Sequence, residues 1–385
     1  MGKAFDVIVV GAGYIGSSAA YHMCMAGLKT ALFDLGSMAA GASRANYGNV
    51  QIQDLELNKS LELIRLARLR FADLEQKQGL KVDFRRIGGL LLIENEAQWK
   101  LMEARLKVVR LKGILSELVP SEHLRELEPH INASAILGGL YHDDEGQVDP
   151  FQFIWGHLVQ ARRLGLQEYY FSEVIGFDVR NGRIQGIITP HGQFSAGAVV
   201  LCTGANSRQL GQLLGRDWDI QYVLGQAMVT DPLEPVLHNH ISSASFFEDQ
   251  PASQEGAVNV VLAMGQSQHG HLLLGEAMVS GKSLQRQVPS RSLPAIAGCI
   301  LRYFPSFRNL RIRRSWSAPV AYTEDSCPWF GPVPGMEGLF LATAFRSTVI
   351  VAPLIGEMVT QLVTSGKCDL IIDDFLPERN SVHAY

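Results

Sequence analysis

The residues with the clearest chemical meaning form a glycine-rich turn near the start of the chain. Gly11, Gly13 and Gly16 follow the apolar run at residues 7–10 and precede a stretch of helical composition, residues 17–26. Asp34 ends a second short apolar run. It follows Gly11 at close to the spacing of about 20 residues that dinucleotide-binding folds show. Strand, turn, helix, second strand and acid in this order predict a site for a dinucleotide. The alternative is a glycine-rich turn without a ligand.

Each of these residue types has a physical task in such a site. Gly11 permits the tight turn, Gly13 lets the backbone approach a pyrophosphate, and Gly16 lets the helix pack closely on the strand. The helix N-terminus offers free N–H groups and the positive end of its dipole to the phosphates. The carboxylate of Asp34 can accept hydrogen bonds from the 2′-hydroxyl of a ribose.

Other polar clusters in the chain are weaker signals. The histidines at 238, 240, 269 and 271 include a His-x-His pair, but no acid or cysteine is spaced to complete a metal site, so we expect sheet histidines and no metal. The arginines between residues 308 and 314 form the one basic cluster. A solvated strand face is one interpretation of this cluster, and a docking surface for a partner subunit is the other.

The composition is that of an ordinary globular enzyme. The chain has 385 residues, of which 47% are hydrophobic and 19% charged, and its net charge of −4 gives no reason to expect nucleic acid as a partner. The five cysteines are scattered without C-x-x-C spacing, as is typical of reduced intracellular thiols. We see neither a signal peptide nor a transmembrane segment, and we therefore predict a cytoplasmic location.

The elements that must position these residues alternate between helices and strands. Amphipathic or apolar periodicity predicts helices over 58–78, 96–112, 150–164 and 352–364, and strands over 87–94, 173–179, 184–189, 198–202 and 339–343. Asn181-Gly182 predicts a hairpin turn, and residues 220–279 alternate like strands of a separate sheet. The predicted fold is α/β, with a discontinuous Rossmann-like domain (1–82, 145–216, 322–385) and an antiparallel-sheet substrate domain (83–144, 217–321).

Several motifs along the whole chain line up in the order of one family. They are residues 6–16, 41–48, 146–150, 199–205, 275–276, Trp316, 323–332 and 352–356. On these motifs the chain resembles the FAD-dependent oxidoreductases of the D-amino-acid oxidase superfamily. The branch it resembles most contains glycine oxidase and the β subunits of sarcosine oxidase, L-proline dehydrogenase and opine- or D-hydroxyproline-oxidising complexes.

The resemblance implies a set of FAD contacts. The pyrophosphate would contact Gly11, Ala12, Gly13, Tyr14, Ile15 and Gly16, and the adenosine would contact Asp34, Leu35 and the backbone of Val174. The phosphates, the ribityl chain or the flavin ring would contact Ser43, Arg44, Asn46, Tyr47, Gly48, Thr203 and Gly204. The edge of the flavin ring would contact Arg346, Ser347, Thr348, Val349 and Ile350. A helix N-terminus after this last loop would stabilise the negative charge of reduced flavin. For Ser43, Arg44 and Asn46, a plain polar loop is the alternative.

The chain also departs from the family pattern. Ala344-Phe345 stands where relatives often have Gly-His or another glycine, and Thr348 or Val349 where they have a second glycine. No arginine follows Trp316 before Tyr322, so one usual carboxylate clamp is missing. There is no cysteine between Cys299 and Cys327, and Pro150 occupies the place of a flavin-linked histidine, so we expect non-covalent FAD and no covalent FMN.

The resemblance implies oxidation of an amine by hydride transfer from the α-carbon to flavin N5, giving an imine that hydrolyses. Arg346 is the first candidate to hold a substrate carboxylate, because a planar guanidinium binds two oxygens at once. Tyr322 and Tyr47 are second candidates for this role. Gln51 or Gln53 could reach the ring or the substrate, and His271 could help to deprotonate the incoming ammonium. Each of these residues could also be an ordinary structural or surface residue.

We therefore expect an enzyme that oxidises the C–N bond of a small amino acid or secondary amine, such as glycine, sarcosine, proline, hydroxyproline or an opine. We favour the catalytic β subunit of a heteromeric dehydrogenase, whose partner subunits carry further redox centres. The alternatives are a stand-alone glycine or D-amino-acid oxidase, an FAD-binding electron-transfer subunit with a silent substrate site, and an NAD-dependent dehydrogenase without flavin.

Overall fold

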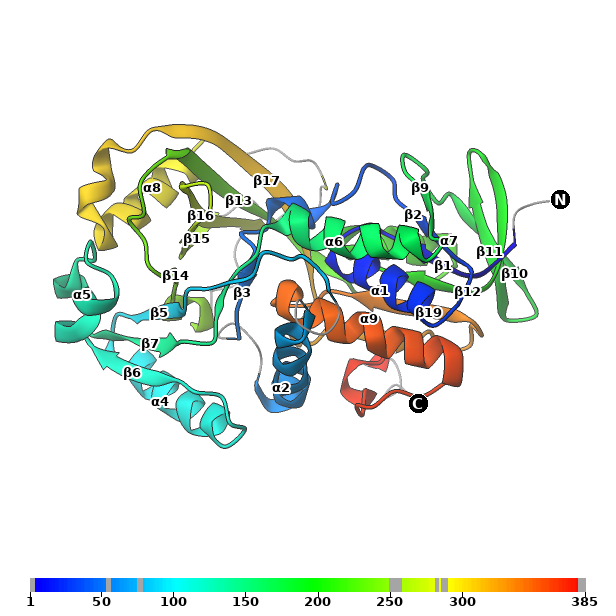
Figure 1. The fold of residues 1–385 in the computed structure, drawn as a ribbon, viewed down its shortest axis with the longest axis horizontal. Coiled ribbons are helices and arrows are strands. Elements are labelled where there is room, and N and C mark those ends of the chain that lie inside the picture. The colour runs from blue at the N-terminus through cyan, green and yellow to red at the C-terminus, as the bar shows by residue number, and fades with distance from the viewer. Residues whose placement is uncertain are drawn as a thin grey trace.

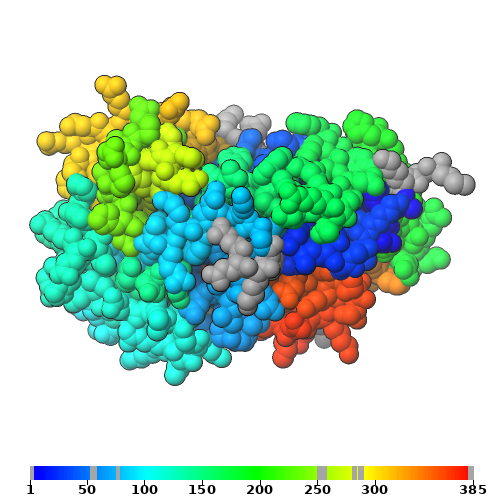
Figure 2. Space-filling view, viewed as in Figure 1, coloured from blue at the N-terminus to red at the C-terminus, as the bar shows by residue number. Residues whose placement is uncertain are grey.

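The elements of this chain gather around two large sheets that lie end to end in the molecule (Figure 1). A computed structural model of the chain describes residues 4–52, 57–74, 79–248, 258–280, 284 and 290–379. Figure 2 shows that the N-terminal and C-terminal segments share one end of the molecule, whereas segments from the middle of the chain form the other. The nucleotide-binding elements expected from the sequence therefore meet although they are far apart along the chain.

The first sheet carries the parallel strands that the glycine-rich turn requires. Its order is β10-β11-β12-β1-β2-β9, and β19 pairs with β12 and β18. Strands β12, β1, β2, β9 and β19 run parallel, and the hairpin β10–β11 turns at Asn181-Gly182 as predicted. The strands are β1 (Ala4–Val10), β2 (Thr30–Phe33), β9 (Gln167–Tyr169), β10 (Gly176–Arg180), β11 (Arg183–Thr189), β12 (Gly192–Leu201), β18 (Trp329–Pro332) and β19 (Leu339–Thr343).

Three helices cover one face of this sheet, and they come from opposite ends of the chain. These are α1 (Tyr14–Met25), α6 (Pro150–Arg163) and α9 (Thr348–Ser365). Val7 and Val9 of β1 point into the core that these helices form, whereas Ile8 and Val10 point into the core on the other face. Helix α6 begins at Pro150, as expected, and Asp149 caps it by accepting hydrogen bonds from the N–H groups of Phe151 and Gln152.

Helices α1 and α9 approach so closely that a side chain larger than hydrogen does not fit between them. A Cβ atom at Gly356 would collide with the hydroxyl and backbone of Ser18, which is fully buried. The Gly356→Ala variant should therefore lose about 1–3 kcal/mol of unfolding free energy, because the two helices must separate. Urea denaturation measures this loss.

Gly298→Ala is the matched control for this variant. Gly298 lies on the exposed side of α8 (Ser292–Tyr303), and nothing lies within 4 Å of a Cβ placed there. In this position alanine should stabilise the helix by about 0.5–1 kcal/mol. A Gly356→Ala protein as stable as the wild type would show that α1 and α9 do not pack in this way.

The second sheet has the order β17-β13-β16-β15-β14-β5-β7-β6 among the described residues. All neighbours in it are antiparallel except β14 and β5, and helix α8 packs on one of its faces through Ile296, Ile300 and Tyr303. The strands are β5 (Gly89–Ile93), β6 (Glu117–Pro120), β7 (Gly138–His142), β13 (Gln221–Pro232), β14 (His240–Ser243), β15 (Val258–Gln266), β16 (His271–Ser280) and β17 (Ile312–Tyr322).

Short elements connect the two sheets. A small sheet joins β3 (Asn49–Val50), β8 (Gly146–Gln147) and β4 (Arg85–Arg86), and helix α2 (Leu57–Ala72) packs against α9. Helices α4 (Glu96–Arg110), α5 (Leu124–Leu127) and α7 (Ser207–Leu213) complete the layers. The predicted α/β class is confirmed, and the division into two domains at the stated boundaries stays a prediction.

The structure differs from the sequence expectations at several places. The strand predicted over 173–179 begins only at Gly176 and ends at Arg180. Helix α9 begins at Thr348 rather than at residue 352, so Thr348, Val349 and Ile350 form its first turn instead of a loop. The basic cluster is not one strand face, because Arg308 lies in a 3-10 helix (Pro305–Asn309) and β17 begins only at Ile312. Pro305 opens this 3-10 turn, and the periodicity of the arginines alone did not reveal it.

Helix α9 is also the described helix that is long and apolar enough to cross a membrane, by length and composition. In the structure 67% of it is buried. It packs against both α1 and α2, and most of its side chains belong to the core of the first sheet. Figure 1 shows α9 beside α1. Packing in the core therefore accounts for the apolar composition of this helix.

A buried carboxylate holds the loop before β14. Glu128 follows α5, and its Oε1 accepts hydrogen bonds from the backbone N–H of His238 (3.0 Å), the backbone N–H of Asn239 (2.6 Å) and the side-chain Nδ2 of Asn239 (2.8 Å). Its Oε2 is buried without a hydrogen-bond partner. Burial raises the pKa of Glu128 to about 7, although these hydrogen bonds oppose the shift.

This shift predicts a pH dependence of stability. The folded pKa lies above the ordinary carboxyl value of about 4.3, so between these two values the folded state binds more protons than the unfolded state. The unfolding free energy contributed by Glu128 therefore falls as the pH rises through this window, by about 3–4 kcal/mol in total.

Glu128→Gln removes the titrating group. The difference in unfolding free energy between wild type and variant, measured with urea from pH 4.5 to 8, should fall with rising pH. Histidines that titrate in the same range cancel in this difference. A difference that stays constant over this range would contradict the assignment.

Candidate active site

A cavity of about 1800 Å³ runs from the first sheet to the second. One end lies at the carboxyl ends of β1, β2, β12 and β19, where residues 11, 34, 203 and 344 follow the strands. The other end lies against β13, β16 and β17 of the second sheet. In open parallel sheets, ligands bind at the carboxyl ends of the strands, so the cavity is where this fold places a ligand.

The glycine-rich turn forms the floor of this cavity at the N-terminus of α1. Gly11 has φ +108°, and a Cβ there would collide with the carbonyl oxygen of Cys202. A Cβ at Gly16 would meet the carbonyl oxygen of Gly11, so this glycine allows the helix to pack on the turn. Gly13 caps the helix without a side-chain hydrogen bond, and Ser43 Oγ accepts a hydrogen bond from Tyr14 N–H at 3.2 Å. The turn leaves a backbone surface suited to a pyrophosphate.

Asp34 borders the cavity and also shapes the turn. Its Oδ2 accepts a hydrogen bond from Ala12 N–H at 2.7 Å, and its Oδ1 accepts one from Gly36 N–H at 2.8 Å. Burial raises the pKa of this carboxyl, while the two hydrogen bonds oppose the shift. Leu35 and Val174 line the same end of the cavity and offer apolar surface beside the acid.

A chain of hydroxyl groups fixes the turn after β12. Thr203 Oγ1 lies 2.8 Å from Ser207 Oγ, which donates to Thr343 Oγ1 at 3.0 Å, and Thr343 in turn donates to the carbonyl of Gly204 at 3.2 Å. Thr203 and Gly204 therefore face the cavity in a defined position between β12 and β19.

The segment between β19 and α9 has the backbone conformation that glycine favours, but without glycine. Ala344 has φ +60° and Ser347, the residue before the first turn of α9, has φ +43°. The structure thus keeps the turn expected where relatives have glycines. Non-glycine residues in the left-handed region destabilise the folded state by about 1–3 kcal/mol each. The first turn of α9 has no acidic residue, and Ser347, Thr348 and Val349 line the cavity. The positive end of this helix dipole therefore points toward the cavity.

The other end of the cavity holds the groups that could contact a substrate. Arg346, Tyr322, Tyr47 and Gln51 all line it, and Oε1 of Gln51 is buried without a hydrogen-bond partner. The backbone N–H of the next residue, Ile52, donates to the buried Glu145 at 2.6 Å, which fixes the segment that carries Gln51. An amide oxygen without a partner in a cavity is an acceptor available to a ligand.

Two cavity residues had no role in the sequence interpretation. Glu276 lies on β16 and was noted only as part of a motif; burial of Tyr47, together with the nearby charge of Glu276, raises the pKa of Tyr47 well above its usual value. Phe246 lies in a 3-10 turn after β14, and its ring centroid lies 5.5 Å from the Arg346 guanidinium. No sequence signal connects residue 246 with residue 346, because only the pairing of β14 with β5 and β15 brings this turn to the cavity.

The structure brings most of the predicted site residues to the cavity. Those that line it are Gly11, Gly13, Tyr14, Ile15, Asp34, Leu35, Ser43, Arg44, Asn46, Tyr47, Val174, Thr203, Gly204, Tyr322, Arg346, Ser347, Thr348 and Val349. Their roles toward a cofactor or substrate stay predictions.

Some predicted residues lie elsewhere. Ala12, Gly16, Gly48 and Ile350 do not line the cavity, because they are buried behind it or, like Gly48, packed against the carbonyl of Val148. His271 lies at the start of β16, where its Nδ1 is 3.0 Å from the carbonyl oxygen of Thr230, and β16 reaches the cavity only further along, at Glu276. The expectation that His271 faces the substrate is therefore not met. Gln53 lies outside the described residues.

The comparisons with known proteins place the chain in a class. A family model described as FAD dependent oxidoreductase matches residues 6–362, and the chain belongs to this family. The protein is thus an FAD-dependent oxidoreductase, as the motif order predicted, and the alternative of an NAD-dependent dehydrogenase is dropped.

Individual relatives are more distant. Glycine oxidase from Geobacillus kaustophilus (strain HTA426) is 25% identical over 372 residues, which cover 94% of each chain. Sarcosine oxidase subunit beta from Rhodobacter capsulatus is 23% identical over 94% of this chain and 86% of that protein. The crystal structure of L-proline dehydrogenase from P. horikoshii superposes with a TM-score of 0.87 at 21% identity, covering 99% of both chains, and shows the same fold.

The residues present fit an FAD. Glycines 11 and 13 leave a surface that a Cβ would fill, because a Cβ at Gly13 would come within 2.7 Å of Ser43 Oγ. The N-termini of α1 and α9 face the cavity at two separate places, as a cofactor with a pyrophosphate and an electron-rich ring requires. The apolar surface of Leu35 and Val174 beside Asp34 suits an adenosine.

Proposed function

We propose that this chain oxidises the C–N bond of a small amino acid or secondary amine of the glycine, sarcosine, proline, hydroxyproline or opine type. The observation that carries the proposal is the position of Arg346, which lines the cavity next to the N-terminus of α9. Among the described residues, no carboxylate lies within ion-pair distance of its guanidinium, so the charge is available to a substrate carboxylate. The names of the relatives, glycine oxidase, sarcosine oxidase and L-proline dehydrogenase, support the same substrate class.

The residues of this chain would bind and orient the substrate. Bound FAD supplies the acceptor for a hydride from the substrate α-carbon. Arg346 binds the carboxylate through two parallel hydrogen bonds, and Tyr322 borders the same space. Gln51 Oε1 accepts a hydrogen bond from the amine nitrogen. Residues of β13, β16 and β17 of the second sheet line the cavity beside these groups and reduce their exposure to water, which strengthens each of these interactions.

We further propose that the chain acts as the catalytic β subunit of a heteromeric dehydrogenase whose partners carry further redox centres. The similarity to sarcosine oxidase subunit beta supports this role. The arginines 311, 313 and 314 are exposed beside and on β17 and offer a basic surface for such a partner. A stand-alone oxidase is the alternative, and a cytoplasmic location is expected for either.

An anaerobic absorbance titration tests the proposal. The purified yellow protein is mixed with glycine, sarcosine, both prolines, hydroxyprolines and opines, and bleaching by one class of compound supports the assigned chemistry. Rapid recovery of the yellow colour in air indicates an oxidase, whereas slow recovery indicates a dehydrogenase.

Bleaching by no compound would favour an electron-transfer subunit with a silent substrate site. The stretch from Trp316 to Tyr322, which contains no arginine, favours this second candidate.

A further inference from the structure

One wall of the cavity is a short turn that comes from the second sheet. Residues 243–248, called here the aromatic shelf, begin with the last residue of β14 and contain the 3-10 helix Ala244–Phe247. Ser243 caps this helix by accepting a hydrogen bond from Ser245 N–H, and Ala244 is fully buried. Phe246 and Glu248 of the shelf both line the cavity, so the shelf presents an aromatic ring and a carboxylate to the same space.

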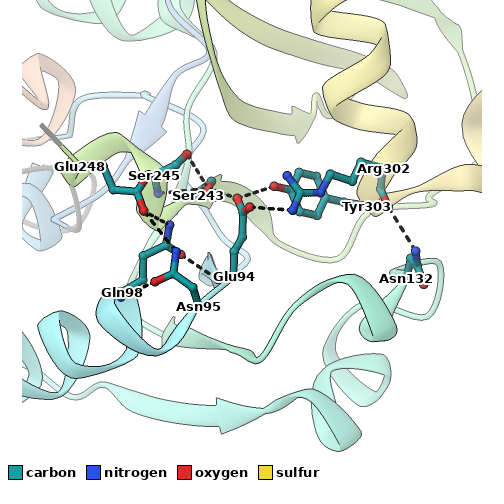
Figure 3. Close-up of polar contacts among 9 residues, drawn as sticks. All are labelled: Glu94, Asn95, Gln98, Asn132, Ser243, Ser245, Glu248, Arg302 and Tyr303. Atoms are coloured by element: carbon teal, nitrogen blue, oxygen red, sulfur yellow. Dashed lines mark hydrogen bonds and ion pairs between the residues drawn. The ribbon is translucent and has the colours of Figure 1, made fainter. Parts of the chain in front are cut away.

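The shelf is tied to two helices by hydrogen bonds (Figure 3). Ser243 Oγ donates to Glu94 Oε1 at 3.1 Å, and the same carboxylate accepts a hydrogen bond from the Tyr303 hydroxyl and pairs with Arg302 at 3.0 Å. Tyr303 and Arg302 belong to the last turn of α8. Glu94 therefore joins the start of the shelf to α8.

A second set of contacts fixes the other end of the shelf. Glu248 Oε1 accepts hydrogen bonds from Gln98 Nε2 at 2.7 Å and from Asn95 Nδ2 at 3.3 Å, and these residues form the N-terminus of α4 (Figure 3). The amides of α4 thus engage the one carboxylate that the shelf carries. What the shelf offers to Arg346 is the ring of Phe246, whose centroid lies 5.5 Å from the guanidinium carbon.

We propose that Phe246 is a positioning residue that makes the site selective for substrates with a carboxylate, by holding the Arg346 guanidinium without neutralising its charge. This inference rests on the proposed function, in which Arg346 binds the substrate carboxylate. A protein carboxylate in place of the ring would pair with Arg346 and compete with the substrate. The face of a phenyl ring attracts the guanidinium and restricts its orientation, yet leaves its N–H groups free for two substrate oxygens.

The anchoring explains why the ring can do this. A mobile ring would hold a flexible arginine only weakly, because both side chains would lose conformational entropy when they come into contact. The contacts of Glu94 and Glu248 hold both ends of the shelf, and the ring is therefore in place before a substrate arrives. Such preorganisation lowers the cost of ordering Arg346 on binding.

The test compares a charged and an uncharged ligand of nearly the same shape on the flavin-loaded protein. Isothermal calorimetry measures the dissociation constants of cyclopentanecarboxylate and cyclopentanecarboxamide, neither of which carries an amine to oxidise. Phe246→Leu should raise the dissociation constant of the carboxylate about tenfold, a change within the range of a partly desolvated cation–π contact. The dissociation constant of the carboxamide should stay within about twofold of the wild-type value, since this neutral ligand does not need an oriented guanidinium.

Two further variants make the result specific. Phe246→Tyr keeps an aromatic face and should restore carboxylate binding to within about threefold of the wild type. Phe247→Leu removes a ring of the same size from the same turn, but this ring lies 4.3 Å from the guanidinium of Arg105 instead of near Arg346. It should leave the ratio of the two dissociation constants unchanged.

The outcomes separate this inference from the proposed function. If Arg346→Ala abolishes the preference for the carboxylate and Phe246→Leu does not, the inference is wrong and the proposed clamp stands. Equal weakening of both ligands by Phe246→Leu would also overturn it, because that pattern reports a damaged cavity. A wild type that does not prefer the carboxylate at all would overturn both.

Discussion

Replacing Arg346 by alanine is expected to lower kcat/KM for the substrate by about 10²- to 10³-fold while the protein stays yellow. The guanidinium lines the cavity, and no described carboxylate pairs with it, so a bound carboxylate would lose two charge-assisted hydrogen bonds. Steady-state kinetics with whichever amine bleaches the flavin measures the loss. The absorbance ratio of flavin to protein shows that the cofactor is retained.

Two other arginine variants sharpen this result. Arg346→Lys keeps a charge but not the two-pronged geometry, and it should recover only part of the lost activity. Arg180→Ala removes an exposed arginine on β10 that pairs with Asp178, and it should leave kcat/KM within about twofold, as exposed ion pairs contribute little. Full activity in Arg346→Ala would show that another group holds the carboxylate.

The second large effect is expected at the floor of the cavity, where Gly13→Val should produce a folded protein that is nearly colourless. Gly13 has φ −87°, which valine can adopt, so the backbone need not change. A Cβ there would lie 2.7 Å from Ser43 Oγ, and the further methyl groups would fill the space that a pyrophosphate needs. We expect the flavin content after purification to fall at least tenfold, as a loss of about 1.4 kcal/mol or more of binding free energy would cause.

The same substitution at Gly298 is the control. That glycine lies on an exposed helix face with open space around it, and its variant should keep the wild-type flavin content. Circular dichroism distinguishes a folded apoprotein from an unfolded one. A yellow Gly13→Val protein would mean that the phosphates do not lie against this turn.

The sequence by itself was sufficient for the parts of the molecule that depend on neighbouring residues. Strand, glycine turn, helix and acid lie within residues 4–34, where hydrogen bonding and side-chain size act over a few positions, and the structure has them as predicted. The same holds for the turn at Asn181-Gly182 and for Pro150 at the start of α6. The ordered motifs were also sufficient for the α/β class, the family and FAD, because their sequence spans the whole chain.

Periodicity was less reliable at the ends of elements. Helix α9 begins at Thr348, four positions before the predicted start, although Ala344 and Ser347 adopt a backbone that their residue types disfavour. Packing of β19 and α9 against the rest of the core offsets the backbone strain at these two residues. The local sequence contains no signal of that packing.

Only the tertiary structure decided which polar groups share the cavity. His271 had the residue type of a base, but the direction of β16 places it away from the cavity and brings Glu276 there instead. Phe246 and Arg346 are a hundred positions apart and follow strands of different sheets, so their contact exists only because β14 pairs with β5 and the shelf is anchored to α4 and α8. Side-chain chemistry can be read from one residue, whereas the distance between two residues depends on the path of the whole chain between them.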